Sequence, residues 1–103
     1  MKVSEAAFAT TIEQLLDMFG WRWMHSRPAK TDRGWRTALS GTDGFPDYLA
    51  VRGDRLLVAE LKSDDGELSI EQYFWLKEMA EAGIDAYLWQ PSDNFDQIVG
   101  ILK

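Results

Sequence analysis

The sequence predicts a single α/β domain over residues 1–103, with the elements ordered helix, three strands, helix, strand, helix. Three observations lead to this prediction. Apolar residues recur at helical spacing near the N-terminus, two strand-like segments flank Gly53-Asp54, and a helix start at Ser69 precedes another strand-like segment. The length of 103 residues is typical of one compact domain, and no repeat, low-complexity tract or linker divides it.

The first helix is expected from Ser4, a residue type that caps helices, to about Phe19, with Gly20 as its stop. At about 100° per residue, Glu5 falls within roughly 40° of the centre of the apolar stripe, whereas Glu13 lies well to its side. Glu5 is therefore either a carboxylate aligned with the buried face or an acid that complements the helix dipole. The stripe consists of Phe8, Ile12, Leu15, Leu16 and Phe19.

The next segment is expected to be a strand from Trp21 to Ser26, with Trp21, Trp23 and His25 on one face. Residues 27–44 contain Pro, Gly, Thr and Asp without a clear period, so they predict a long loop. Long loops in compact domains are usually functional or mobile.

Two strands over residues 45–52 and 55–62 are expected to form a hairpin around Gly53-Asp54, because Gly at the first central position suits a type II′ turn. A polar turn over residues 63–67 leads to the second helix, which Ser69 and Gln72 begin with a capping box and Gly83 ends. A strand over residues 84–89 then precedes a last short helix, capped by Ser92.

The charge distribution is uneven. The net charge of −6 divides into +2 for residues 1–40 and −8 for residues 41–103. Residues 22–36 carry five basic residues and one acid, together with Trp23 and Trp35. This basic, aromatic segment either contacts phosphate groups or is simply solvated surface.

Composition also excludes several classes of protein. Without Cys the chain has no disulfide framework, thiol nucleophile or thiolate metal site. No apolar run approaches the roughly 18 residues of a membrane span, and no signal peptide is visible. A cytosolic domain is therefore expected.

The hairpin carries the candidate chemistry. If Arg52 faces Arg55, then Asp47 faces Glu60, with Cβ atoms about 4.5–5.5 Å apart, and Lys62 points to the same side. Facing carboxylates repel each other, so hairpin stability gives no reason for the pair, whereas a bound Mg²⁺ or Mn²⁺ does. The alternative is a strand-end salt bridge between Lys62 and one of the acids.

These residues resemble a known signature. Pro46-Asp47, followed after twelve residues by Glu60-Leu61-Lys62, is similar to the PD-(D/E)xK nuclease motif. Further segments resemble the VRR-NUC group, particularly its short stand-alone phage and bacterial members. These segments are Gly44-Phe45-Pro46-Asp47, Glu60-Leu61-Lys62-Ser63, Gln72, Trp75, Trp89-Gln90-Pro91-Ser92-Asp93, and Gly20-Trp21 followed by His25. The resemblance covers nearly the whole chain and is weakest in residues 27–43.

The resemblance implies a restriction-endonuclease-like core, with a mixed sheet of about four strands flanked by helices. It implies a Mg²⁺- or Mn²⁺-dependent enzyme that cuts DNA to leave a 5′-phosphate. Asp47 and Glu60 would ligate the metal with the main-chain carbonyl of Leu61, and Lys62 would serve catalysis. Glu5 is the candidate for a further acid from the core helix, with Glu13 as the fallback.

Gln72 has two interpretations that are compatible: it completes a capping box, and the resemblance implies that it also faces the active site. His25, the only histidine, is a candidate for DNA contact, and a direct catalytic role is the less favoured alternative. Phosphate contacts are expected from four basic residues, which would bind DNA without reading its sequence: Arg27, Lys30, Arg33 and Arg36.

The resemblance also implies a homodimer that acts on branched DNA, such as four-way junctions, in a bacterium or a phage-infected cell. The second helix has more large apolar residues than one buried face needs, which suits an interface. The competing hypotheses are a catalytically silent DNA-binding module on the same fold and a protein–protein adaptor.

Overall fold

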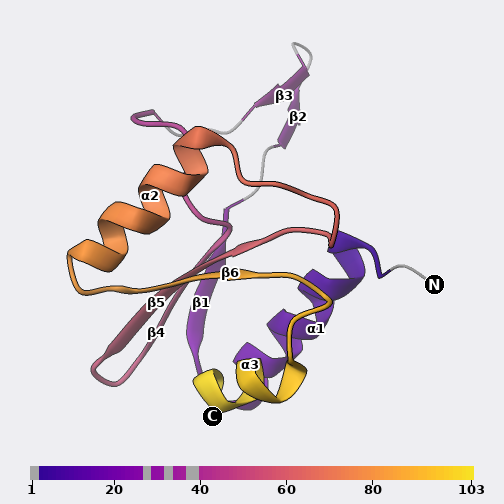
Figure 1. Cartoon of the computed structure of the whole chain (residues 1–103), viewed down its shortest axis with the longest axis vertical. Coiled ribbons are helices and arrows are strands. Elements are labelled where there is room, and N and C mark those ends of the chain that lie inside the picture. The colour runs from indigo at the N-terminus through magenta and orange to yellow at the C-terminus, as the bar shows by residue number, and fades with distance from the viewer. Residues whose placement is uncertain (1–2, 27–28, 32–33, 37–39) are drawn as a thin grey trace.

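The computed structural model describes residues 3–26, 29–31, 34–36 and 40–103. In Figure 1 a sheet lies between α1 and α3 on one side and α2 on the other. In this part of the chain, no helix has the length and apolar character needed to cross a membrane. The elements are α1 (Glu5–Met18), β1 (Arg22–His25), β2 (Ala29–Thr31), β3 (Gly34–Arg36), β4 (Tyr48–Arg52), β5 (Arg55–Leu61), α2 (Ile70–Glu81), β6 (Asp85–Trp89) and α3 (Phe95–Leu102).

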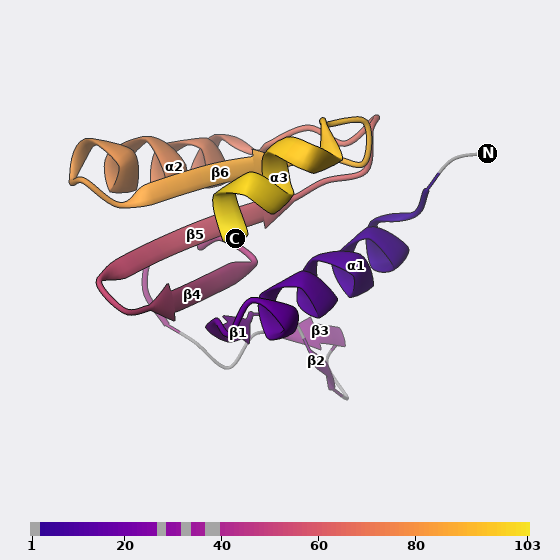
Figure 2. The same cartoon turned by 90° about the horizontal axis from the view of Figure 1, so that it is seen from below.

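The main sheet has the strand order β1-β4-β5-β6. β1, β4 and β5 are antiparallel neighbours, whereas β6 runs parallel to β5 after the α2 crossover. This is the mixed four-stranded sheet that was predicted. α1 and α3 lie together, apart from α2 (Figure 1), and their buried apolar residues pack on the sheet face that carries Leu57, Ala59 and Leu61. Figure 2 shows the same sheet and helices from below.

The start of α1 agrees with its sequence signals. The Ser4 side chain accepts a hydrogen bond from the Ala7 N–H at 3.0 Å, and Gly20 ends the helix with a φ of 77°. Among the residues that line the predicted stripe, Phe19 is only partly buried, and the others form the inner face of the helix. Those buried residues are Phe8, Ile12, Leu15 and Leu16.

The β4–β5 hairpin has the predicted register, in which Arg52 pairs with Arg55 and Leu49 with Val58. Gly53 has a φ of 62° and Asp54 has no positive φ, which matches a type II′ turn. β4 begins at Tyr48 rather than Phe45, so the expected strand start is wrong by three residues. Gly44 and Phe45 instead lie beside α2, outside the sheet ladder.

Arg52 and Arg55 are like charges on paired positions, and Trp21 and the helix ends compensate for them. Both guanidinium groups lie over the Trp21 ring, at 4.7 and 5.0 Å from its centroid. Arg52 also donates hydrogen bonds to the carbonyls of Phe19 and Leu102, at 2.9 and 2.8 Å. These carbonyls are the negative ends of α1 and α3, so the hairpin tip fastens both helices to the sheet.

The prediction of a structureless loop over residues 27–44 is wrong in part, because β2 and β3 form a small antiparallel hairpin in which Lys30 pairs with Trp35. Strands of three residues are too short to show an alternating pattern in the sequence.

The predicted cap of the last helix at Ser92 is also wrong. Asn94 caps α3, and its side chain accepts a hydrogen bond from the Asp96 N–H at 3.0 Å. The Ser92 N–H instead donates to Asp64 Oδ1 at 2.8 Å, because a turn joins β6 to the helix.

Candidate active site

The predicted acid pair lies at the end of the β4–β5 hairpin. Beyond the last ladder pair, Asp47 Oδ2 accepts a hydrogen bond from the Leu61 N–H at 2.9 Å. This bond fixes the Asp47 carboxylate beside the end of β5, next to Glu60. The ladder ends at the pair of Tyr48 and Ala59, so Asp47 and Glu60 are not the directly opposed strand pair that was expected, although the Asp47 carboxylate still lies next to Glu60.

Glu60 is an unusual residue for a protein core. Its exposed fraction is only 2%. Among the buried residues that the structure describes, it is the only one with an ionisable acidic or basic side chain other than tyrosine. Its Oε2 atom has no hydrogen-bond partner among those residues. Because buried charges are normally paired or bound to a metal, this oxygen indicates that a ligand completes the site.

The electrostatics of Glu60 follow from this position. Burial, together with the hydrogen bond and the charge of the neighbouring Asp47, raises the pKa of the Glu60 carboxyl from its ordinary value of 4.5 to about 9. Lys62 acts in the opposite direction, and Glu5 adds to the increase. All four candidate groups therefore lie close enough to interact electrostatically.

Gln72 joins the second helix to the Glu60 carboxylate as well as completing the predicted capping box. Its N–H donates to Ser69 Oγ at 3.1 Å, while its Oε1 accepts from the Ser69 N–H at 2.9 Å. The same side chain donates from Nε2 to Glu60 Oε1 over a long 3.4 Å hydrogen bond. The capping box thus fixes a side chain that reaches the buried acid.

Glu5 and Glu13 both line one cavity of about 400 Å³, together with Asp47 and Leu61. Glu5 is exposed in the first turn of α1, and its charge acts on Glu60. Glu13 is one of the partners of His25 and Tyr48. Of the two helix acids, Glu5 is the one whose charge acts on the Glu60 carboxyl, and its role as a site residue stays a prediction.

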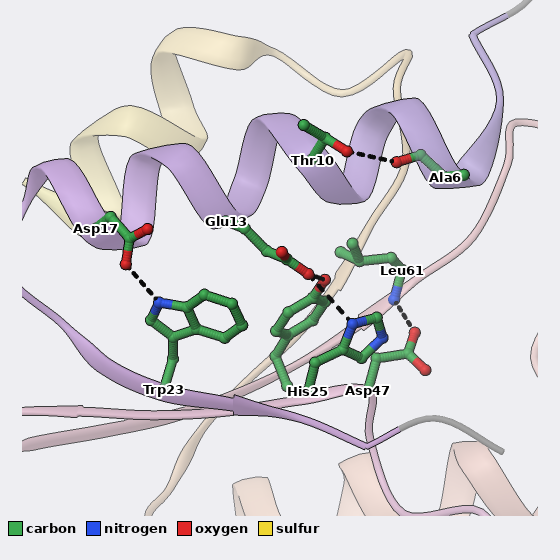
Figure 3. A network of polar contacts seen from close by, with 9 residues as sticks. Ala6, Thr10, Glu13, Asp17, Trp23, His25, Asp47 and Leu61 are labelled. Carbon is green, nitrogen blue, oxygen red and sulfur yellow. Dashed lines mark hydrogen bonds and ion pairs between the residues drawn. The ribbon is translucent and has the colours of Figure 1, made fainter. Parts of the chain in front are cut away.

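His25 lies on the wall of the same cavity. Its Nδ1 is 3.2 Å from Glu13 Oε2, an oxygen that also accepts a hydrogen bond from the Tyr48 hydroxyl. The imidazole stacks on the Tyr48 ring with centroids 4.1 Å apart. Figure 3 shows His25 between Glu13 of α1 and Asp47, so this side chain is fixed within the site region.

The predicted phosphate-binding set is placed only through its backbone. Lys30 lies in β2 and Arg36 in β3, on neighbouring strands of the small hairpin. Arg27 and Arg33 lie outside the described residues.

The structure identifies three positioning residues that the sequence reasoning did not single out for this role. Trp75 donates from Nε1 to the Asp43 carbonyl at 2.9 Å, and Gly44 packs against the main chain of α2. Gln90 donates from Nε2 to the Ser63 carbonyl at 3.1 Å, which fixes the turn after Lys62. Their contacts are long-range, and the only sequence signal was that they fall within the segments that resemble the VRR-NUC group.

The donor set fits a hard divalent cation bound through few protein ligands. No group of three or more His, Cys, Asp or Glu side chains in the described ranges is arranged to hold a metal by itself. Asp47 and Glu60 supply two carboxylates, and the buried Glu60 Oε2 lacks a partner. Mg²⁺ is typically held by one or two carboxylates, with water and substrate oxygens completing its shell.

Comparisons with known proteins bear on the fold. No protein-family model and no curated protein matches the sequence. A solved structure described as a "VRR_NUC domain protein" matches with a TM-score of 0.66 and 20% sequence identity. The alignment covers 99% of this chain and 87% of that one. The resemblance predicted from the sequence motifs is thus confirmed in three dimensions: the chain has the fold of a VRR-NUC domain.

Proposed function

We propose that this protein is a divalent-metal-dependent endonuclease that hydrolyses DNA phosphodiesters. The observation that carries the proposal is the acid pair, in which the buried Glu60 has an unpartnered oxygen and lies beside the half-buried Asp47. Such a pair is costly without a cation and suits Mg²⁺ or Mn²⁺. The fold of a VRR_NUC domain protein supports the assignment to nucleases.

The roles of the residues follow from their positions. Asp47 and Glu60 would hold the cation with the main-chain carbonyl of Leu61. The cation would neutralise the phosphate, activate water and stabilise the leaving oxygen. Lys62, whose charge acts on Glu60, is placed to hold a phosphate oxygen or to orient the attacking water.

Two residues from the flanking helices complete the proposed site. Gln72 donates to the buried carboxylate and fixes its orientation. Glu5 adds a carboxylate from α1, on the side of the cavity that Asp47 shares. The acids thus come from three separate elements, which suits a site that assembles only in the folded domain.

The substrate that we propose is branched DNA, such as a four-way junction, in a bacterium or a phage-infected cell. The support for this substrate is the resemblance of the sequence motifs to the VRR-NUC group. The body of residues 41–103 has a net charge of −8, which would weaken unspecific binding and direct DNA to the basic segment. DNA would contact the basic segment through His25, Arg27, Lys30, Arg33 and Arg36. Such contacts depend strongly on salt concentration.

The test is cleavage of labelled four-way junction, flap, linear duplex and single strand, with Mg²⁺, Mn²⁺ or EDTA. We expect divalent-dependent cutting that Glu60→Gln and Lys62→Ala abolish. Lys77→Ala is the matched control, because Lys77 is exposed on α2 and pairs with Glu81. Tight junction binding without cleavage in any metal would instead indicate a silent DNA-binding module. Neither binding nor cleavage would favour a protein–protein adaptor.

We also propose that the protein acts as a homodimer, with a second copy covering apolar residues on α2. No residue of α2 is fully buried, and Ile70, Tyr73 and Phe74 are 72%, 51% and 49% exposed. Exposed apolar surface of this kind marks interaction sites. Light scattering should give twice the chain mass of 11.8 kDa, and Phe74→Glu should give a folded monomer. A wild-type monomer at working concentration would refute the dimer.

A further inference from the structure

We propose that the cavity between α1 and β1 binds the nucleoside that adjoins the scissile phosphate. This inference rests on the proposed nuclease function and names the substrate more closely. The cavity has a volume of about 400 Å³ and is lined by α1, by the end of β1 and by Asp47. Small-molecule sites typically have volumes of roughly 300–1,000 Å³, so one nucleoside is a ligand of suitable size.

The location connects the cavity to the proposed chemistry. Asp47 is at once a wall of the cavity and one half of the acid pair. Leu61, whose N–H binds the Asp47 carboxylate, is another wall residue. A phosphodiester held at Asp47 and Glu60 would therefore place one of its two attached nucleosides at this cavity.

The lining favours a nucleoside over a second phosphate. Ala6 and Ala9 of α1 give a small apolar wall that a sugar or base ring can contact. Glu5 and Glu13 are acids on the same lining, and they would repel a phosphate group. Carboxylates accept hydrogen bonds from the amino groups of bases, so the cavity suits a base or sugar with donor groups.

The cavity wall is already fixed in place. The His25 ring of this wall is oriented by Glu13 and stacked on Tyr48. Outside the cavity, Trp23 Nε1 of β1 donates to Asp17 of α1 at 2.8 Å and ties the same strand to the helix. Figure 3 shows both links between α1 and β1. A preformed site loses less conformational entropy when a ligand binds.

This geometry has a consequence for substrate choice. A nucleoside can enter the cavity only when it is out of the base stack, which costs a few kcal/mol in duplex DNA and least for a base that is already unpaired. The substrate class that follows is DNA with an unpaired nucleotide next to the scissile phosphate, as at a flap or a branch point. Regular duplex should be a poor substrate.

The test uses two matched variants of α1. Ala6 and Ala7 are both exposed in the first turns, and both of their carbonyls accept a hydrogen bond from a threonine hydroxyl four residues on, but only Ala6 lines the cavity. Ala6→Leu should raise KM for a labelled flap about tenfold and leave kcat within about twofold, whereas Ala7→Leu should match wild type. An Ala6→Leu enzyme with wild-type KM would overturn the proposal.

A binding measurement keeps this proposal separate from the nuclease assignment. Titration with the dinucleoside monophosphate of deoxycytidine in Mg²⁺ should shift the amide resonances of Ala6, Ala9, Thr10 and Ser26, and Ala6→Leu should weaken this binding about tenfold. If wild type shows these shifts but never cuts DNA, nucleoside binding at the cavity stands, and the nuclease function fails together with the link to a scissile phosphate. If wild type cuts DNA but these amides do not shift, the cavity assignment is refuted and the nuclease stands.

Discussion

The Nε2 atom of Gln72 lies 3.4 Å from Oε1 of Glu60, which joins the first turn of α2 to the buried acid of β5. The same glutamine closes the capping box with Ser69, so the start of the helix and the acid site share one side chain. Helix capping is a local property, whereas the contact with Glu60 depends on how α2 packs over the sheet.

The two roles of Gln72 can be separated by substitution. Gln72→Glu keeps the capping box, since Glu serves at that position as well as Gln, but it places a third carboxylate beside Glu60. We expect cleavage to fall at least about tenfold with little change in thermal stability. Gln72→Ala loses both roles and should also cost about 1 kcal/mol of stability. A Gln72→Glu enzyme that cuts at the wild-type rate would limit Gln72 to capping.

The raised pKa of Glu60 predicts how stability depends on pH in the absence of metal. The folded state holds the Glu60 proton up to about pH 9, whereas the unfolded chain releases it near the ordinary pKa of 4.5. The contribution of the Glu60 carboxyl to the free energy of unfolding is therefore fully present below pH 4.5 and is lost progressively as the pH rises to 9. Glu60→Gln, which cannot ionise, should be more stable than wild type at pH 8 in EDTA, by an amount on the order of a few kcal/mol.

The measurement for this prediction is urea unfolding at several pH values between 4.5 and 9. The free energy of unfolding of wild type should decrease with pH relative to that of Glu60→Gln. Equal slopes for the two proteins would show that Glu60 ionises as an ordinary carboxyl and would weaken the case for a costly acid pair.

Metal binding should reverse this loss of stability. A cation that binds only the folded state at about 100 times its Kd stabilises it by about 2.7 kcal/mol. We expect Mn²⁺ to raise the Tm of wild type but not that of Asp47→Asn or Glu60→Gln. Asp54→Asn is the control, because Asp54 is an exposed acid in the hairpin turn. Mn²⁺ affinity should increase as the pH rises toward 9, because Glu60 must lose its proton to bind the ion.

Gly44 should be sensitive to the addition of a single methyl group. A Cβ at this position would lie 2.6 Å from the main-chain carbon of Glu71 and 2.8 Å from the Gln72 nitrogen. Gly44→Ala should therefore displace the segment that leads into Asp47 and reduce both stability and metal affinity. Gly41→Ala is the matched control, because Gly41 also has a positive φ but no atom lies within 4 Å of its added Cβ.

The size of the difference between these two variants measures the close approach alone. Gly41→Ala should cost about 1 kcal/mol from backbone strain. Gly44→Ala should reduce the free energy of unfolding by at least about 1 kcal/mol more than Gly41→Ala does, which is the cost typical of an overpacked core site. Equal losses of stability, measured by urea unfolding, would show that the main chain of α2 moves away from the added Cβ without reducing the free energy of unfolding.

The features that the sequence by itself determined depend on residues close together along the chain. Ser4 and Ser69 cap their helices because a cap needs only a side chain and the next turn. The hairpin register follows from Gly53-Asp54 and the two-residue period of strands. The juxtaposition of Asp47 and Glu60 follows from that register.

The tertiary structure alone decided how distant segments meet. The sequence left Glu5 and Glu13 as alternatives, and only the packing of α1 beside β1 and β5 directs Glu13 to His25 and brings the charge of Glu5 to bear on Glu60. The approach of Gly44 to α2 is likewise a contact between surfaces. Burial is the physical reason. The desolvation that raises the pKa of Glu60 arises only when the helices cover the sheet, and no short-range sequence pattern encodes it.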